Sequence, residues 1–171
     1  MTNTIQALNK SVDNWLKDLK TYRFDQLLIK PSTETWSLGQ VYMHLIESTH
    51  YFILQAKLCA TNDDHRNEET STKARSMILN NEFPNLRLDG PPTNAFTKQP
   101  ESKGKIAQDL LALKEEIELA GTFISKSNFQ GKTKHPGLSY FNAYEWLLFS
   151  EMHFRHHLRQ KKRIDDFLNN K

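Results

Sequence analysis

The chain has 171 residues, a mean hydropathy of −0.68 and a formal net charge of +3, values typical of a polar chain of ordinary domain size. No apolar run approaches the roughly 20 residues that span a bilayer, and the first ten residues lack the basic-then-apolar order of a signal peptide. From the length we expect one domain over residues 1–171, and from the lack of a long apolar run we expect no membrane partner. The single cysteine, Cys59, excludes an internal disulfide and therefore favours a cytoplasmic location.

The apolar spacing at the N-terminus predicts a first helix over residues 3–22. Its apolar residues recur three or four positions apart, as on one face of a helix. They are Ile5, Leu8, Val12, Trp15, Leu16 and Leu19. A short extended segment should follow, interrupted at Pro31.

A second helix should begin after Ser37 and end near Ala60. Ser37 and Gln40 have the spacing of a capping box, in which each side chain bonds the other residue's backbone amide. The main apolar stripe comprises Leu38, Val41, Tyr42, Leu45, Ile46, Thr49, Phe52, Ile53 and Ala56. Because Leu54 and Leu58 lie off this stripe, we expect the helix to be buried on more than one side.

The middle of the chain reads as loop and short helix. Residues 62–69 are polar, and residues 70–80 predict a short helix. Four of the six prolines lie between Pro84 and Pro100, so residues 83–102 should form a long connection. A connection of this length is typically a functional lid or a crossover.

Two further long helices should complete the chain. The third spans residues 103–127, a turn region follows at residues 130–136, and the fourth spans residues 142–168. Asn142 and Glu145 repeat the capping-box spacing at the start of the fourth helix. Four long helices, a long connection, a short extra helix and almost no strand pattern predict an all-α bundle.

The fourth helix carries the most informative residues. Positions spaced alternately four and three apart form its inward seam: Trp146, Ser150, His153, His157, Gln160, Ile164 and Phe167. Buried imidazoles need partners for both ring nitrogens. Because His153 and His157 are one turn apart, they could bind one metal ion at about 2.0–2.1 Å each. From the pair alone, hydrogen-bonded core histidines are an equally good interpretation.

A third ligand would come from another part of the chain. On the second helix, His44 flanks the main stripe whereas His50 points away from it, so His44 is the better candidate. His156 should flank the pair as a surface residue or a neighbour of the ligands. His65 and His135 are interpreted as exposed loop residues, with a place near a pocket mouth as the alternative.

Two segments resemble the signatures of the DinB/YfiT-like proteins. Residues 36–45, which begin Trp36-Ser37 and end His44-Leu45, are similar to the first signature. Residues 153–160, which contain His153, His156-His157 and Gln160, are similar to the second. Residues 135–146 are also similar to the segment that leads into that helix.

The resemblance implies a fold and a chemistry. The fold is a four-helix bundle with up-down-down-up connectivity, and the long connection suits one of its crossovers. The site is a centre of three histidines, His44, His153 and His157, that binds Zn²⁺ or Ni²⁺ with open coordination positions. Relatives resemble thiol S-transferases or hydrolases, so the implied partner is a small molecule such as a low-molecular-weight thiol. Relatives also pair as homodimers.

No residue is assigned a catalytic role from the sequence. Glu47, Glu145 and Glu151 are candidate bases, although solvated helix carboxylates are the better interpretation of each. The alternative to an enzyme is a non-catalytic metal-binding or small-ligand-binding module. The basic residues from Arg155 to Arg163 offer a nucleic-acid surface, but we favour a solvated helix end and expect no nucleic-acid partner.

Overall fold

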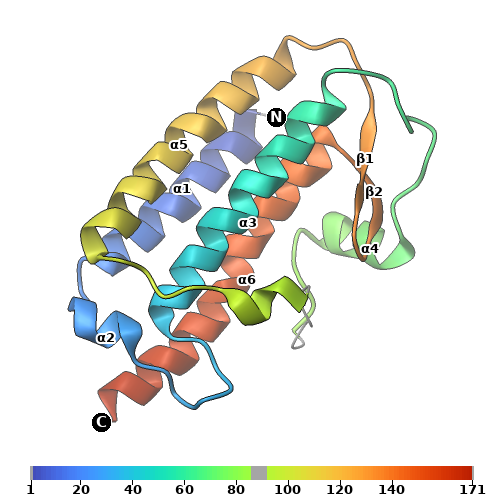
Figure 1. Cartoon of the computed structure of the whole chain (residues 1–171). Helices are drawn as coiled ribbons and strands as arrows, with labels where there is room; N and C mark the ends of the chain where they lie inside the picture. The colour runs from blue at the N-terminus through green and yellow to red at the C-terminus, as the bar shows by residue number, and fades with distance from the viewer. Residues whose placement is uncertain (1, 86–91, 171) are drawn as a thin grey trace.

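Four long helices dominate the computed structural model, which describes residues 2–85 and 92–170 (Figure 1). The long helices are α1 (Thr2–Leu19), α3 (Leu38–Cys59), α5 (Lys103–Ser125) and α6 (Ala143–Asn169). The shorter elements are α2 (Phe24–Leu28), α4 (Thr72–Asn80), the 3-10 helix η1 (Pro92–Phe96) and the strands β1 (Lys132–His135) and β2 (Ser139–Asn142). The predicted all-α bundle with a short extra helix is therefore confirmed.

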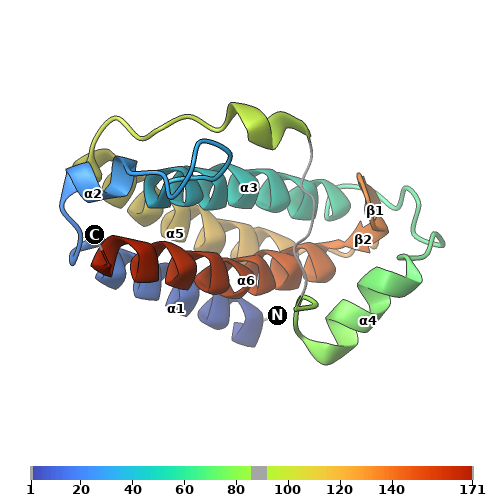
Figure 2. The same cartoon turned by 90° about the horizontal axis from the view of Figure 1, so that it is seen from below.

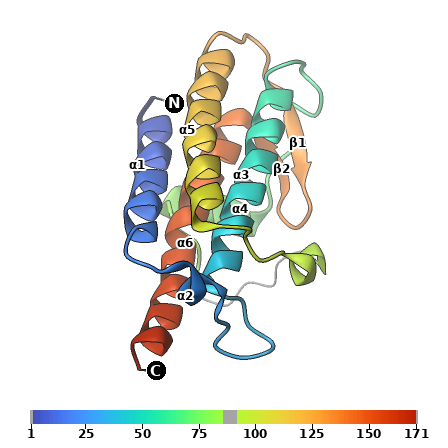
Figure 3. The same cartoon turned by 60° about the vertical axis from the view of Figure 1, so that its left-hand side comes forward.

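The connectivity is up-down-down-up, as the resemblance implied. Helices α3 and α5 run in one direction, and α1 and α6 run in the other (Figures 1 and 2). Helix α1 packs against α5 and α6, and α3 packs against the same two helices, so α1 and α3 lie diagonally across the bundle. Figure 3 shows α1, α5 and α3 side by side.

Both predicted capping boxes are present, and they fix where α3 and α6 begin. The Ser37 hydroxyl accepts from the Gln40 amide at 3.2 Å, and the Gln40 side chain accepts from the Ser37 amide at 3.2 Å. Asn142 and Glu145 form the same pair of bonds at 2.9 and 2.8 Å. These local bonds satisfy amides that have no partner within the helix, and they set the phase of the histidine-bearing turns.

Three local expectations were wrong. The segment after α1 is not extended, because Gln26 caps the Arg23 amide at 2.9 Å and Leu27 is fully buried, which stabilises the one-turn helix α2. Leu54 and Leu58 are 53% and 41% exposed and therefore do not bury a further side of α3, although this helix does contact α2, α5, α6 and β1. The turn region at residues 130–136 instead contains β1, which pairs with β2.

The end of the long connection lies over the start of α3. The Ser37 hydroxyl donates to Gln99 Oε1 at 2.7 Å, and Gln40 Nε2 donates to the Thr97 carbonyl at 2.6 Å. A Cβ at Gly39 would lie 2.8 Å from the Leu27 carbonyl oxygen and from Pro100, so only glycine permits this close approach. The part of the predicted connection at residues 86–91 lies outside the described residues.

Candidate metal centre

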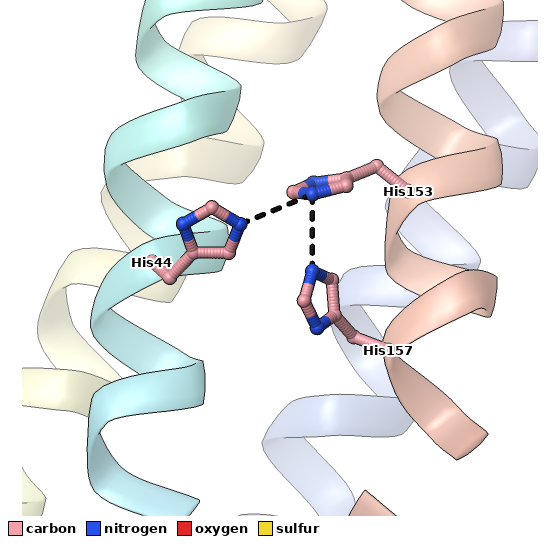
Figure 4. Close-up of side chains that lie close together, drawn as sticks. All are labelled: His44, His153 and His157. Atoms are coloured by element: carbon pink, nitrogen blue, oxygen red, sulfur yellow. Dashed lines mark hydrogen bonds between the residues drawn. The ribbon is translucent and has the colours of Figure 1, made fainter. Parts of the chain in front are cut away.

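Three histidine rings from two antiparallel helices point toward one another in the bundle core (Figure 4). His44 projects from α3, and His153 and His157 project from consecutive turns of α6. The Nε2 atom of His153 lies 3.2 Å from that of His44 and 3.0 Å from that of His157. All three offer a ligand atom within 4.8 Å of one another, so the seam interpretation and the resemblance select residues that the fold brings together.

The separations of His153 Nε2 from the Nε2 atoms of His44 and His157 suit a divalent ion. Two nitrogens held 2.0–2.1 Å from one ion at angles between 90° and 109° are about 2.8–3.4 Å apart, a range that includes both separations. His157 Nδ1 faces the acceptor oxygen of Gln160 and therefore carries the ring proton. The lone pair of its Nε2 is then free and faces the other rings, as a metal ligand requires.

Burial keeps the three rings neutral. It lowers the pKa of His44 to about 4 and that of His157 to about 3, with a smaller contribution from neighbouring histidines. Burial likewise lowers the pKa of His153 well below its ordinary value. Their relative exposures are only 7–9%, and a neutral imidazole is the form that binds metal, so the rings are in the protonation state that a metal ion requires.

Two outer partners orient the ligand histidines. Gln160 Oε1 lies 2.9 Å from His157 Nδ1, and Ser48 Oγ lies 3.3 Å from His44 Nδ1. Such contacts fix the ring tautomer and the direction of the coordinating nitrogen. The sequence analysis did not identify Ser48, although its position one turn after His44 is the spacing that would have indicated it.

Aromatic rings surround the histidines on the remaining sides. Trp36 lies 4.9 Å from His44 between ring centroids, and Phe52 lies 5.5 Å from His153. Phe83 lies 5.1 Å from His156 and 6.2 Å from His153. The sequence analysis identified none of these as wall residues, because a lone aromatic residue has no spacing signature.

Two further histidines occupy the places that the sequence predicted. His156 is half-buried and packs 5.2 Å from His157 between ring centroids, outside the cluster of three. His50 is exposed on α3 and pairs with Glu116 of α5 at 2.5 Å. Neither histidine belongs to the cluster of three candidate ligands.

His135 is not the exposed loop residue that we expected. It lies at the end of β1 and stacks on Trp146 with centroids 5.4 Å apart and an interplanar angle of 29°. Phe141 and Phe149 complete the slot, and burial lowers the pKa of His135 to about 4. Its Nδ1 accepts from the Gly137 amide at 3.1 Å. The slot forms because the β-hairpin folds back over the start of α6.

The three candidate carboxylate bases lie away from the histidine cluster. Glu47 is exposed, and within the described residues it has no hydrogen bond or ion pair. Glu145 belongs to the capping box of α6, and buried Glu151 pairs with Arg155 at 2.7 Å. The interpretation of Glu47 and Glu145 as helix carboxylates without a catalytic partner agrees with these positions, whereas Glu151 is buried instead of solvated.

The basic cluster near the C-terminus is largely paired within the chain. Arg155 and Arg159 bond residues of the segment that follows α4. Lys161 pairs with Asp18 and Asp165, and Lys162 pairs with Asp166. The acidic partners neutralise part of the charge of this cluster, whereas the acceptors of Arg159 are neutral.

The chain belongs to the DinB superfamily, whose family model matches residues 3–160. The match covers both histidine segments, all of α3 and α5, and most of α1 and α6. The search of curated proteins found no matching relative. Within the part of the chain that the structure describes, no helix has both the length and the apolarity needed to cross a bilayer.

Proposed function

We propose that the chain binds one divalent metal ion through the Nε2 atoms of His44, His153 and His157, and that it uses this centre as a transferase or hydrolase for a small molecule. The observation that carries the proposal is the convergence of three buried, neutral imidazoles, with the Nε2 atoms of His44 and His157 3.2 and 3.0 Å from that of His153. Zn²⁺ and Ni²⁺ are the expected ions, since imidazole suits both.

The chain's own residues set the character of the site. Three neutral imidazoles leave the ion's full positive charge in place, and no carboxylate of the described residues joins the cluster. Bound zinc or nickel supplies Lewis acidity and activates a coordinated water or thiolate. The aromatic rings of Trp36, Phe52 and Phe83 exclude water and offer apolar contacts. A positive centre in an apolar surround favours an anionic ligand such as the thiolate of a low-molecular-weight thiol.

A second candidate function is non-catalytic binding of a metal or small ligand. The observation that favours it is the position of Glu47, Glu145 and Glu151, none of which is placed to act as a base beside the histidines. In this alternative the centre would hold its ligand without turning it over.

Elemental analysis of untreated protein, followed by Zn²⁺ and Ni²⁺ titration of the metal-free form, tests the metal site. We expect one equivalent of metal for wild type and none for His44→Ala. His50→Ala is the matched control, since His50 is on the same helix but exposed. Wild-type protein that neither contains nor takes up metal would refute the proposal.

A reaction screen separates the two candidate functions. Thiol conjugation and ester or amide hydrolysis are measured with wild type and with His153→Ala. Turnover that depends on both metal and His153 supports the enzyme, whereas metal binding without turnover across the screen supports the binding module.

A further inference from the structure

The three candidate ligands differ in how their second ring nitrogen is held. His44 Nδ1 has Ser48 and His157 Nδ1 has Gln160, but His153 Nδ1 is buried without a hydrogen-bond partner among the described residues. A metal-binding histidine is ordinarily oriented through that nitrogen. The ring of His153, the central one of the three, is therefore held only through its Nε2 contacts with His44 and His157 and by packing.

Three phenylalanine rings provide that packing. Phe149 lies nearly parallel to His153, with an interplanar angle of 8° and centroids 6.5 Å apart. Phe52 meets the His153 ring at 79° and 5.5 Å, and Phe83 meets it at 56° and 6.2 Å. Phe52 and Phe149 belong to α3 and α6, which already carry the histidines. Phe83 comes from the segment after α4, so its place depends on how that segment is held.

Two arginines hold this segment against α6. Arg155 donates to the Asn81 carbonyl at 2.8 Å and to Asn81 Oδ1 at 2.9 Å, while its other contacts anchor it to buried Glu151. Arg159, one turn later, donates to the Phe83 carbonyl at 3.1 Å and to Asn85 Oδ1 at 2.6 Å. Hydrogen bonds from a guanidinium are stronger than neutral ones, and its fixed geometry restrains direction as well as distance.

The backbone itself is adapted to this attachment. Asn81 ends α4 in the left-handed region at φ 50°, where asparagine is tolerated better than most residues. This conformation turns the chain toward α6, and two residues later the Phe83 side chain is only 4% exposed. Phe83 also lies 4.9 Å from Phe149 between ring centroids, so it packs on the other rings of the same cage.

We propose that Phe83 is a positioning residue for His153 and that Arg159, assisted by Arg155, holds it in place. The segment after α4 thereby completes the histidine cluster, although it supplies no ligand itself. The consequence for metal binding rests on the proposed function, whereas the positioning of the ring does not.

Imidazole NMR of the metal-free protein tests the positioning directly. Phe83→Ala and Arg159→Met should shift and broaden the ring signals of His153, while the signals of His44, which Ser48 and Trp36 contact, should change little. Two controls remove a similar group elsewhere on α6. Phe154→Leu alters a buried ring that packs on Trp15, and Lys162→Met alters an exposed ion pair. Unchanged His153 signals in both test variants would overturn the proposal.

Cobalt binding tests the consequence for the metal site. Loss of outer support typically costs a metal site about 10–100-fold in affinity, so Phe83→Ala should weaken Co²⁺ binding by about 10-fold or more and change the visible absorption of the ion. Arg159→Met should have a smaller effect in the same direction, and Arg159→Lys should restore part of it. Variants that bind Co²⁺ with the wild-type affinity and spectrum would overturn the role of Phe83 in the metal site. Wild type that does not bind Co²⁺ would overturn the proposed function, and the NMR result would still decide the positioning.

Discussion

The two antiparallel helix pairs of the bundle bury different kinds of side chain. Between α1 and α5 the buried contacts are mainly apolar, and a Cβ at Gly121 would lie 2.9 Å from Ile5. The polar contacts between these two helices, Asn9 with Glu118 and Asp13 with Lys114, are exposed. Between α3 and α6 the core holds His44, His153 and His157 together with Thr49 and Ser150. Apart from Thr4, every buried polar residue of the described chain lies on α3, on its N-cap Ser37, or on α6.

This difference indicates that one helix pair mainly stabilises the bundle and the other carries the candidate site. Aliphatic packing stabilises a bundle through the hydrophobic effect, whereas buried imidazoles cost free energy unless each ring nitrogen has a partner. The α1–α5 pair therefore has the character of a scaffold. The α3–α6 pair retains polar groups that an optimally stable core would not contain, and such departures concentrate at functional sites.

His153→Leu should have the largest effect of these variants, because it should abolish tight metal binding and leave the stability of the bundle largely intact. The change removes the central nitrogen donor, so metal affinity should fall by more than the roughly 100-fold that loss of an outer partner costs. It also removes a buried nitrogen that lacks a partner, which offsets the loss of the Nε2 contacts with His44 and His157, so the metal-free protein should lose little stability. Metal titration and urea unfolding check the two effects, and a strongly destabilised metal-free variant would contradict the contrast.

Leu113→Ala should have the converse effect. Leu113 is fully buried on α5 within the apolar core, so the cavity should lower the free energy of unfolding by about 2–5 kcal/mol. Metal affinity measured well below the unfolding temperature should stay within a few-fold of wild type. A large loss of metal affinity would show that the two helix pairs are not independent.

Acid should destabilise the protein partly through His135. Its pKa is lowered to about 4 by burial, so between about pH 6.5 and pH 4 the unfolded chain binds a proton that the folded chain excludes. Stability is therefore full above pH 6.5 and falls as the pH is lowered. The Oδ1 atom of asparagine can also accept from the Gly137 amide, so His135→Asn is a suitable variant. Between pH 7.5 and pH 5.5, its free energy of unfolding in urea should fall by up to about 1 kcal/mol less than that of wild type. Equal losses would show that His135 is not the group responsible.

Lys162→Ala should have the smallest effect. Lys162 and Asp166 are exposed and form an ion pair at 2.9 Å within α6, and such pairs contribute about 0.5 kcal/mol or less. Thermal unfolding and metal titration should both remain close to wild type. If the variant instead lost salt-sensitive DNA binding that wild type possessed, the interpretation of this helix end as merely solvated would be wrong.

The sequence predicted the features that local patterns determine. The capping boxes at Ser37 and Asn142 fixed the starts of α3 and α6, because their partners are three residues apart. The one-turn spacing of His153 and His157 identified two of the three candidate ligands. The position of His44 beside the apolar stripe, together with the resemblance to a known family, supplied the third. The expected burial of Leu54 and Leu58 was wrong, since an apolar residue does not by itself indicate which face of a helix its neighbours will leave exposed.

The remaining features depend on contacts between distant residues. The hairpin that buries His135 pairs strands with little alternating pattern, and Leu27 stabilises α2 only because α3 is there to cover it. The attachment of Phe83 by Arg159 joins residues 76 positions apart and uses a backbone carbonyl as acceptor. Any residue supplies a carbonyl, so nothing in the sequence indicates which one an arginine will bind.

The division of the donors between α3 and α6 has a consequence for how the chain folds. His153 and His157 form a chelating pair as soon as one turn of α6 exists, but His44 lies 109 residues before His153 and joins only when the two ends of the chain have assembled. An ion bound early in folding by the pair alone would thus be held weakly. Tight binding would begin only when α3 and α6 have packed together. Because a ligand that binds only the folded state stabilises it by mass action, loading with metal should slow unfolding far more than it speeds refolding.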